Sequence, residues 1–164
     1  MIKAVIFDLD GTLIHLPIDY ERLFREFSKI VKTADMRPLA KTISKLDEKA
    51  KKKLFEVWDN AELAALTDAT VNDEGIALYK KFSGKPKALV TMQGKALVQN
   101  ILKRLGLSFN FVVTREHCLN RVEQLKIAAE KLRAPLRNIL FIGNTDDDFL
   151  TAEKVGCGFL RVAE

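Results

Sequence analysis

The apolar residues of this chain fall into five short runs that predict strands. None of the runs alternates strictly between apolar and polar positions, and all are rich in β-branched or other apolar residues. Continuous runs of this kind are typical of parallel strands that are buried on both faces of a sheet. The predicted strands cover residues 4–7, 87–91, 111–113, 138–143 and 158–162.

Helical spacing of apolar residues separates the later strands. One pattern runs from Leu97 to Leu105 and ends at Gly106, and another runs from Leu125 to Leu132 before Pro135. A repeated order of strand, helix and strand predicts βαβ units with right-handed crossovers.

The segment from about residue 15 to about residue 83 has a different pattern, with no convincing strand. Its apolar stripes are typical of helices that pack on one another rather than of a cofactor site. The helices predicted there cover about residues 20–31, 37–46, 47–66 and 72–82.

Together these elements predict an α/β protein. We expect a Rossmann-like parallel sheet of about five strands flanked by helices, with a small all-helical cap inserted after the first strand. The core domain would comprise residues 1–14 and 84–164, and the cap would comprise residues 15–83. The hinges of the cap are expected near residues 15–17 and 83–87.

Composition and charge narrow the class of protein without changing this outline. The 164 residues are 48% hydrophobic and 30% charged, which is ordinary for one globular domain. Cys118 and Cys157 match no metal-binding spacing and are interpreted as reduced thiols. No apolar run approaches the roughly 20 residues that span a bilayer, and the N-terminus lacks the pattern of a signal peptide. We therefore expect a cytoplasmic protein with no membrane partner.

The net charge of +5 suggests an anionic partner but does not identify it. The densest basic run, residues 49–53, would spread its lysines around a helix rather than form one stripe. A solvated helix face is the favoured interpretation, and no nucleic-acid partner is expected. The sequence gives no indication of an oligomeric state.

Polar residues that could carry chemistry follow three of the predicted strands. Asp8 and Asp10 follow the first strand, Thr91 closes the second, and residues 143–148 (GNTDDD) follow the fourth. Two carboxylates placed this close raise each other's cost of ionisation. The carboxyl ends of parallel strands meet at one edge, where a divalent cation would neutralise the carboxylates. Oxygen ligands of this kind suit Mg²⁺.

These motifs resemble those of the haloacid dehalogenase superfamily. The resemblance rests on "DLDGT" after a buried strand, "LVT" at the end of the next strand, a basic residue before a helix, and "IGNTDDD". The helical insertion lies where that superfamily has its C1-type cap. The segment "TREHCLNRVEQLKIAAEKL" also resembles the phosphoglycolate-phosphatase-like branch.

The resemblance implies a role for each matching residue. Asp8 would be the nucleophile that forms an aspartyl phosphate. Asp10 would act as general acid and base, and its backbone carbonyl would ligate Mg²⁺. The hydroxyl of Thr91 would bind a phosphoryl oxygen together with amides near Gly94. Asp148 would be a further metal ligand.

Two positions depart from the family pattern. The fourth motif usually begins with Gly-Asp, and here Asn144 would ligate Mg²⁺ through a neutral amide, so weaker metal binding and low activity are expected. The lysine of the third motif is missing. Arg121 is the best substitute and would offer a planar fork to the phosphate. Lys126 is the alternative, although it lies about a turn into the helix.

The implied function is a Mg²⁺-dependent phosphomonoester hydrolase that acts on a small phosphorylated metabolite, with phosphoglycolate as a candidate by resemblance only. The alternative is a catalytically weakened phosphate-binding or regulatory relative. A dehalogenase is disfavoured because that branch lacks the acid/base residue that Asp10 would supply. A response-regulator receiver normally carries its phosphoacceptor after the third strand. A dinucleotide-binding fold is disfavoured because no G-x-G-x-x-G follows the first strand.

Overall fold

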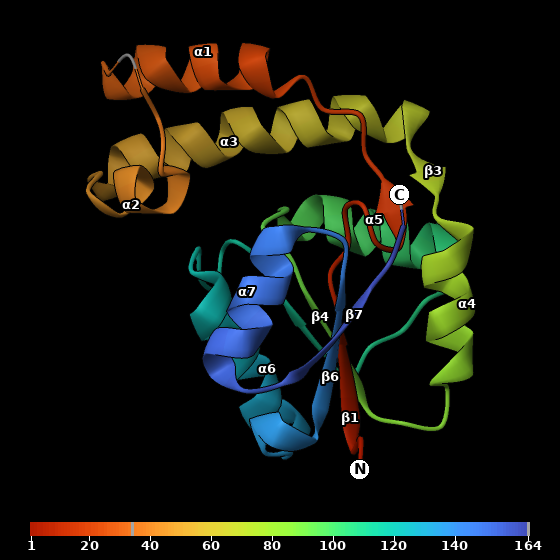
Figure 1. Ribbon diagram of the computed structural model, residues 1–164. Helices are drawn as coiled ribbons and strands as arrows, with labels where there is room; N and C mark the ends of the chain where they lie inside the picture. The colour runs from red at the N-terminus through yellow and green to blue at the C-terminus, as the bar shows by residue number, and fades with distance from the viewer. Residues whose placement is uncertain (34, 164) are drawn as a thin grey trace.

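The computed structural model describes residues 1–33 and 35–163. At its centre lies a five-stranded sheet in the order β5-β4-β1-β6-β7, in which every neighbouring pair of strands is parallel (Figure 1). These are the five predicted strands, and the Rossmann-like α/β class is confirmed. Their bounds are β1 (Ala4–Phe7), β4 (Lys87–Val90), β5 (Phe111–Val113), β6 (Ile139–Gly143) and β7 (Gly158–Arg161).

Strand β1 occupies the middle of the sheet, and all four of its residues are buried. The chain adds β4 and β5 on one side of β1, and then returns to add β6 and β7 on the other side. The strand order therefore reverses between β1 and β6. In open α/β sheets, ligands bind beyond the carboxyl ends of the strands at such a reversal. The loops that follow β1 and β6 carry the two acidic motifs.

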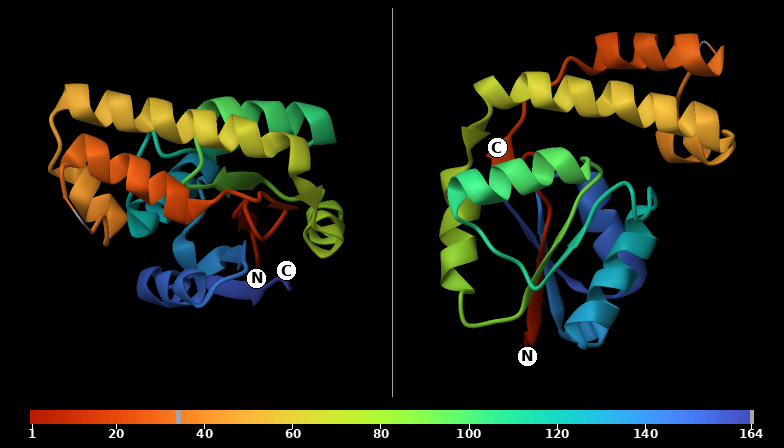
Figure 2. Two further views of the ribbon diagram at one scale, coloured as in Figure 1. Left: turned by 90° about the horizontal axis from the view of Figure 1, so that it is seen from above. Right: turned by 180° about the vertical axis from the view of Figure 1, so that it is seen from behind.

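Helices cover both faces of the sheet (Figures 1 and 2). Successive residues of β1 point to opposite faces. Val5 and Phe7 join an apolar cluster with α4 and α5, whereas Ala4 and Ile6 join a second cluster with α6 and α7. Burial on both faces explains why the strands form continuous apolar runs. The four helices are α4 (Asp73–Lys81), α5 (Lys95–Leu105), α6 (Arg121–Leu132) and α7 (Asp146–Val155).

A separate helical layer lies over the carboxyl edge of the sheet (Figure 1). It has its own apolar cluster, centred on Phe27 and Trp58. Asp19 and Asp47 begin its first and third helices by accepting backbone hydrogen bonds from Arg22 and Ala50. The layer consists of α1 (Tyr20–Val31), α2 (Leu39–Ser44) and α3 (Glu48–Ala65), followed by a short 3₁₀ helix, η1 (Leu66–Asp68). We call this layer the cap.

The connection between the cap and the core differs from the prediction. Strands β2 (Ile14–His15) and β3 (Thr70–Val71) pair antiparallel, so the prediction that no strand lies between residues 15 and 83 was wrong. Two-residue strands are too short to show a periodic pattern. The second connection runs through β3 rather than near residues 83–87, because α4 packs against the sheet.

The division into a core of residues 1–14 and 84–164 and a cap of residues 15–83 stays a prediction, with positions 34 and 164 outside the described residues. The packing of α4 favours grouping that helix with the core. A short 3₁₀ helix, η2 (Leu136–Asn138), precedes β6. In the described ranges, every helix is too short or too polar to cross a lipid bilayer.

Candidate active site

Asp8 leaves the end of β1 and lies almost buried at the reversal point of the sheet. Its backbone amide donates to the carbonyl of Ile142 in β6, 2.9 Å away, which continues the strand pairing by one residue. The chain then turns at Gly11, where φ is +81°. A Cβ at that position would lie 2.1 Å from Nδ2 of Asn144. Glycine is therefore required both for the turn and for the close approach of the two motif loops.

Arg121, the first residue of α6, joins the two acidic motifs. Its Nη2 lies 2.7 Å from Oδ1 of Asp8 and 3.2 Å from Oδ1 of Asp148. Its Nη1 donates to Oε1 of Gln124 at 3.2 Å. Lys126 instead pairs with Glu123 at 3.6 Å, and both side chains are about half exposed. Of the two basic residues proposed for the third motif, the geometry brings only Arg121 to Asp8.

The charges in this cluster are strongly coupled. Burial raises the pKa of Asp8 to about 6; Arg121 acts against this rise, and the carboxylate of Asp148 adds to it. Burial disfavours the charged form of Arg121, but Asp8 and Asp148 together raise its pKa above the usual value. Arg121 therefore remains a cation, and it favours the ionised form of Asp8 that a nucleophile requires.

Asp148 is held in place by the start of α7. Its Oδ2 accepts hydrogen bonds from the backbone amides of Asn144 at 3.2 Å and Thr145 at 3.3 Å. The hydroxyl of Thr145 accepts the amide of Asp148 at 3.0 Å, which completes a capping box. A Cβ at Gly143 would lie 2.6 Å from Oδ2 of Asp148, so glycine makes room for this carboxylate.

Asp10 and Asn144 lie around the same turn. Oδ1 of Asp10 accepts the backbone amide of Leu16 at 2.9 Å, which joins the loop after β1 to the segment that leads into the cap. Oδ1 of Asn144 accepts the hydroxyl of Thr12 at 3.4 Å. The loop after β1 and the loop after β6 are thus joined by side-chain contacts as well as by the sheet.

Thr91 lies at the end of β4 and is fully buried. Its hydroxyl donates to Oε1 of Gln93 and accepts the backbone amide of Gln93 at 3.1 Å. The amide of Gly94, which the sequence analysis assigned to phosphate binding, donates at 3.0 Å to Oε1 of Glu62 in the cap. A cap carboxylate therefore accepts the amide of the residue that precedes α5.

Gln124 is a residue that the sequence analysis missed. Its Nε2 donates to the carbonyls of Thr91 at 3.0 Å and Cys118 at 2.8 Å, while its Oε1 accepts from Arg121. The side chain is completely buried. A signal existed, because position 124 falls on the apolar face of α6 defined by Leu125 and Ala128. A polar residue on such a face indicates a buried hydrogen-bond network.

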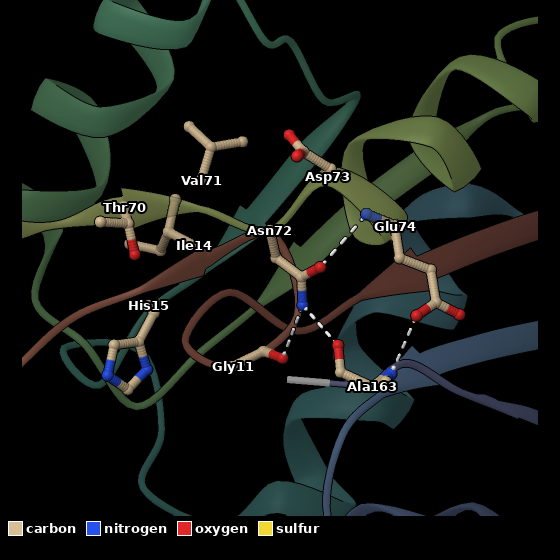
Figure 3. A pocket seen from close by; sticks show the side chains of 9 residues that line it. All are labelled: Gly11, Ile14, His15, Thr70, Val71, Asn72, Asp73, Glu74 and Ala163. Carbon is tan, nitrogen blue, oxygen red and sulfur yellow. Dashed lines mark hydrogen bonds between the residues drawn. The ribbon is translucent and has the colours of Figure 1, made fainter.

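His15 is exposed and lines a pocket of about 550 Å³ on the hinge strands (Figure 3). Asn72 in the same pocket donates through Nδ2 to the carbonyls of Gly11 at 3.3 Å and Ala163 at 2.9 Å. A Cβ at Gly75 would lie 1.8 Å from the carbonyl oxygen of Thr12. The start of α4 therefore packs against the loop that follows β1.

The oxygen atoms at the strand ends fit Mg²⁺ as a site with two carboxylates. Asp8 and Asp148 both approach the same arginine nitrogen, and Asn144 lies between their loops. Within residues 1–33 and 35–163, no three acidic, histidine or cysteine side chains gather as a metal cluster. Mg²⁺ needs no such cluster, because it commonly uses one or two carboxylates with waters and substrate phosphate. The donor set therefore suits this ion.

Comparison with known proteins agrees with the architecture. No family model matches the chain. A curated phosphoglycolate phosphatase of Neisseria meningitidis serogroup A is 24% identical, over 95% of this chain and 78% of the relative. A phosphoglycolate phosphatase of Neisseria gonorrhoeae matches equally, with the same identity and coverage.

Solved structures with the same fold cover nearly the whole chain. A HAD-superfamily hydrolase of subfamily IA, variant 1, from Geobacter sulfurreducens has a TM-score of 0.66 at 18% identity, over 98% of this chain and 89% of that one. CbbY from Rhodobacter sphaeroides, solved in complex with phosphate, has a TM-score of 0.73 at 14% identity, over 100% and 87%. The chain therefore has the fold of the haloacid dehalogenase superfamily. Its resemblance to the phosphoglycolate-phosphatase-like branch is confirmed.

Proposed function

We propose that this protein hydrolyses a small phosphomonoester through an aspartyl phosphate on Asp8. The observation that carries the proposal is the shared contact of Arg121 with Asp8 and Asp148 at the carboxyl edge of the sheet. An arginine between two carboxylates is positioned to bind a phosphoryl group beside the nucleophile. Ligands named for structural neighbours support the class: phosphate is bound in one CbbY structure and xylulose-(1,5)-bisphosphate in another.

In this proposal Asp8 attacks phosphorus and the leaving oxygen departs with a proton from Asp10. Asp10 then removes a proton from the water that attacks the aspartyl phosphate, which regenerates Asp8 and releases phosphate. The fork of Arg121 binds the phosphoryl oxygens, and Gln124 orients the fork through Oε1. Thr91 would reach the phosphate after its hydroxyl turns away from Gln93.

Mg²⁺ would be held by the carboxylates of Asp8 and Asp148, the backbone carbonyl of Asp10 and the amide oxygen of Asn144. When bound, the ion would supply positive charge that offsets the carboxylates and the phosphate. The cap lies over the carboxyl edge of the sheet and would exclude water from the site during the reaction. Phosphoglycolate, the substrate named for the curated relatives, is one candidate, and a cytoplasmic location is part of the same proposal.

A second candidate function is phosphate binding with little catalysis. Asn144 in place of the usual aspartate removes one negative charge from the metal site. In addition, Arg121 pairs with Asp8 at 2.7 Å, which competes with a metal for the same carboxylate. Such a protein would bind phosphate or a phosphorylated ligand and act as a sensor or regulator.

Turnover of p-nitrophenyl phosphate with Mg²⁺ separates these two functions. The wild-type chain and Asp8→Asn are compared, with Asp147→Asn as a matched control because Asp147 is exposed on the first turn of α7. The proposal predicts that Asp8→Asn loses about 10³-fold or more in turnover while the control keeps its activity. Equal low rates in all three forms, together with saturable phosphate binding, would favour the second candidate.

A further inference from the structure

A second arginine, Arg115, reaches from the core into the cap. It follows β5 by two residues, and its side chain is fully buried. Its Nη1 lies 2.9 Å from Oε1 of Glu62, and its Nη2 pairs with Oδ1 of Asp59, both on α3. Its Cζ lies 4.2 Å from the ring centroid of Trp58 on the same helix. We call Asp59, Glu62 and Arg115 the cap cluster.

Glu62 connects this cluster to a second loop of the core. The same Oε1 that pairs with Arg115 accepts the amide of Gly94 at 3.0 Å. Arg115 also donates through Nη1 to the carbonyl of Met92 at 3.2 Å. A Cβ at Gly94 would lie 2.5 Å from Asp59 and 2.6 Å from Arg115, so the loop fits closely beneath α3. The loop after β4 and the loop after β5 are thus joined to one cap helix.

This loop is the one that carries Thr91. Gln93, which binds the hydroxyl of Thr91, immediately precedes Gly94. The phenol of Tyr20, at the start of α1, also belongs to this region: burial raises its pKa, the carboxylates of Asp10 and Glu62 add to the rise, and a hydrogen bond with Gln93 opposes it. The position of α3 therefore bears directly on the geometry of the candidate phosphate site.

The cap cluster adds little net stability compared with an apolar contact of similar size, although removing one of its partners would be costly. Among the described residues, three buried side-chain atoms have no hydrogen-bond partner: Nε1 of Trp58, Oε2 of Glu62 and Nε of Arg115. All three atoms belong to the contact that Arg115 makes with Trp58 and Glu62. A buried ion pair recovers its desolvation cost only when its remaining polar atoms are also satisfied. What the cluster does provide is one specific alignment of α3 on the two core loops.

We propose that Glu62 and Arg115 are positioning residues, which align the closed cap on the loop that carries Thr91. The alignment of the cap stands on the contacts above, whereas its effect on turnover rests on the proposed phosphatase function. Loss of either residue should loosen the start of α5 and the facing part of α3, while β1 and α6 keep their structure.

Hydrogen–deuterium exchange tests the alignment without any substrate. The conservative variants Glu62→Gln and Arg115→Lys keep the size of each side chain, and Glu26→Gln serves as the control because Glu26 forms an exposed pair with Lys29 on α1. Amides of residues 92–98 and of α3 should exchange about tenfold faster in the two test variants. Exchange in β1 and α6 should match the wild type, as should all exchange in the control. Unchanged exchange, or equally faster exchange throughout the chain, would overturn the proposal.

Kinetics of the same variants then separate the two proposals. If the chain is a phosphatase, Glu62→Gln and Arg115→Lys should lower kcat several-fold with little change in KM for p-nitrophenyl phosphate. Faster local exchange in a chain with no turnover would leave the alignment intact and reject the phosphatase function. Normal kcat in variants whose start of α5 exchanges faster would reject the link between cap position and the site.

Discussion

Two arginines of this protein, Arg115 and Arg121, each pair with two acidic residues but serve different parts of the molecule. Arg121 binds Asp8 and Asp148 within the core, and Arg115 binds Asp59 and Glu62 between the core and the cap. The Arg121 side chain is 21% exposed, whereas that of Arg115 is 0% exposed. A guanidinium that is partly exposed to solvent can bind a ligand, whereas a fully buried one can only bind groups of the protein itself. We therefore propose that the chemistry depends on the residues around Arg121, whereas the alignment of the cap depends on the cap cluster.

The largest effect is expected from breaking the cluster of Asp8, Arg121 and Asp148, which we call the core cluster. Arg121→Ala should lower turnover of p-nitrophenyl phosphate by about 10³-fold, because the phosphoryl group would lose its cationic partner beside Asp8. Arg121→Lys should keep part of the activity, since it keeps the charge and loses the fork. Initial rates measure both variants. Lys126→Ala should behave like the wild type, and a comparable loss in that variant would contradict the assignment.

Breaking the cap cluster should affect stability more than chemistry. Arg115→Ala would leave Glu62 and Asp59 without their cation, at a cost of about 3 kcal/mol in the free energy of unfolding. Urea denaturation followed by circular dichroism measures this change. Glu26→Gln removes an exposed pair and should shift the free energy by less than about 0.5 kcal/mol. A similar small shift for Arg115→Ala would show that the cap cluster contributes little.

One substitution tests the proposed metal site in the core cluster. Asn144→Asp restores a negative charge next to Asp8 and Asp148, and should tighten Mg²⁺ binding about tenfold. Isothermal titration calorimetry of both forms with Mg²⁺ measures the affinities directly. Identical affinities would indicate that Asn144 lies outside the metal shell.

A further expected effect is a dependence of stability on pH that arises in the cap cluster. Burial raises the pKa of Glu62 to about 7, with Arg115 and the Gly94 amide acting against the rise and Asp59 adding to it. Between pH 4.5, the ordinary pKa of the group, and about pH 7, Glu62 keeps its proton in the folded chain but has lost it in the unfolded chain. Stability from this group therefore falls as the pH rises through that window.

Glu62→Gln should flatten this part of the pH profile. Urea midpoints of the wild type and the variant, measured at several values between pH 4.5 and 7, provide the comparison. The difference between the two forms should grow steadily over the window. A difference that stays constant with pH would show that Glu62 does not titrate there.

The core cluster could be predicted from the sequence because local patterns place its members. Strand ends follow from apolar runs, and parallel strands bring their carboxyl ends to one edge, which puts Asp8 and Asp148 together. Arg121 begins a helix whose start is marked by the cap of Asn120 on Glu123. Each of these features depends on a few neighbouring residues.

The cap cluster could not be predicted because it depends on how α3 lies on the core. Arg115 lies 56 residues beyond Asp59 along the chain, and no local pattern pairs it with the two acidic residues of α3. The paired strands β2 and β3 were not predicted, because two residues are too few to show a periodic pattern. Gln124 was predictable in principle, because it interrupts the apolar face of α6.

Peptide mapping after acid quenching during turnover locates the phosphoryl group on the chain. A peptide containing Asp8 should gain the mass of one phosphoryl group in the wild-type chain, and the gain should disappear in Asp8→Asn. Steady hydrolysis of p-nitrophenyl phosphate with the phosphoryl group on another residue, or with an unchanged rate in Asp8→Asn, would contradict the account.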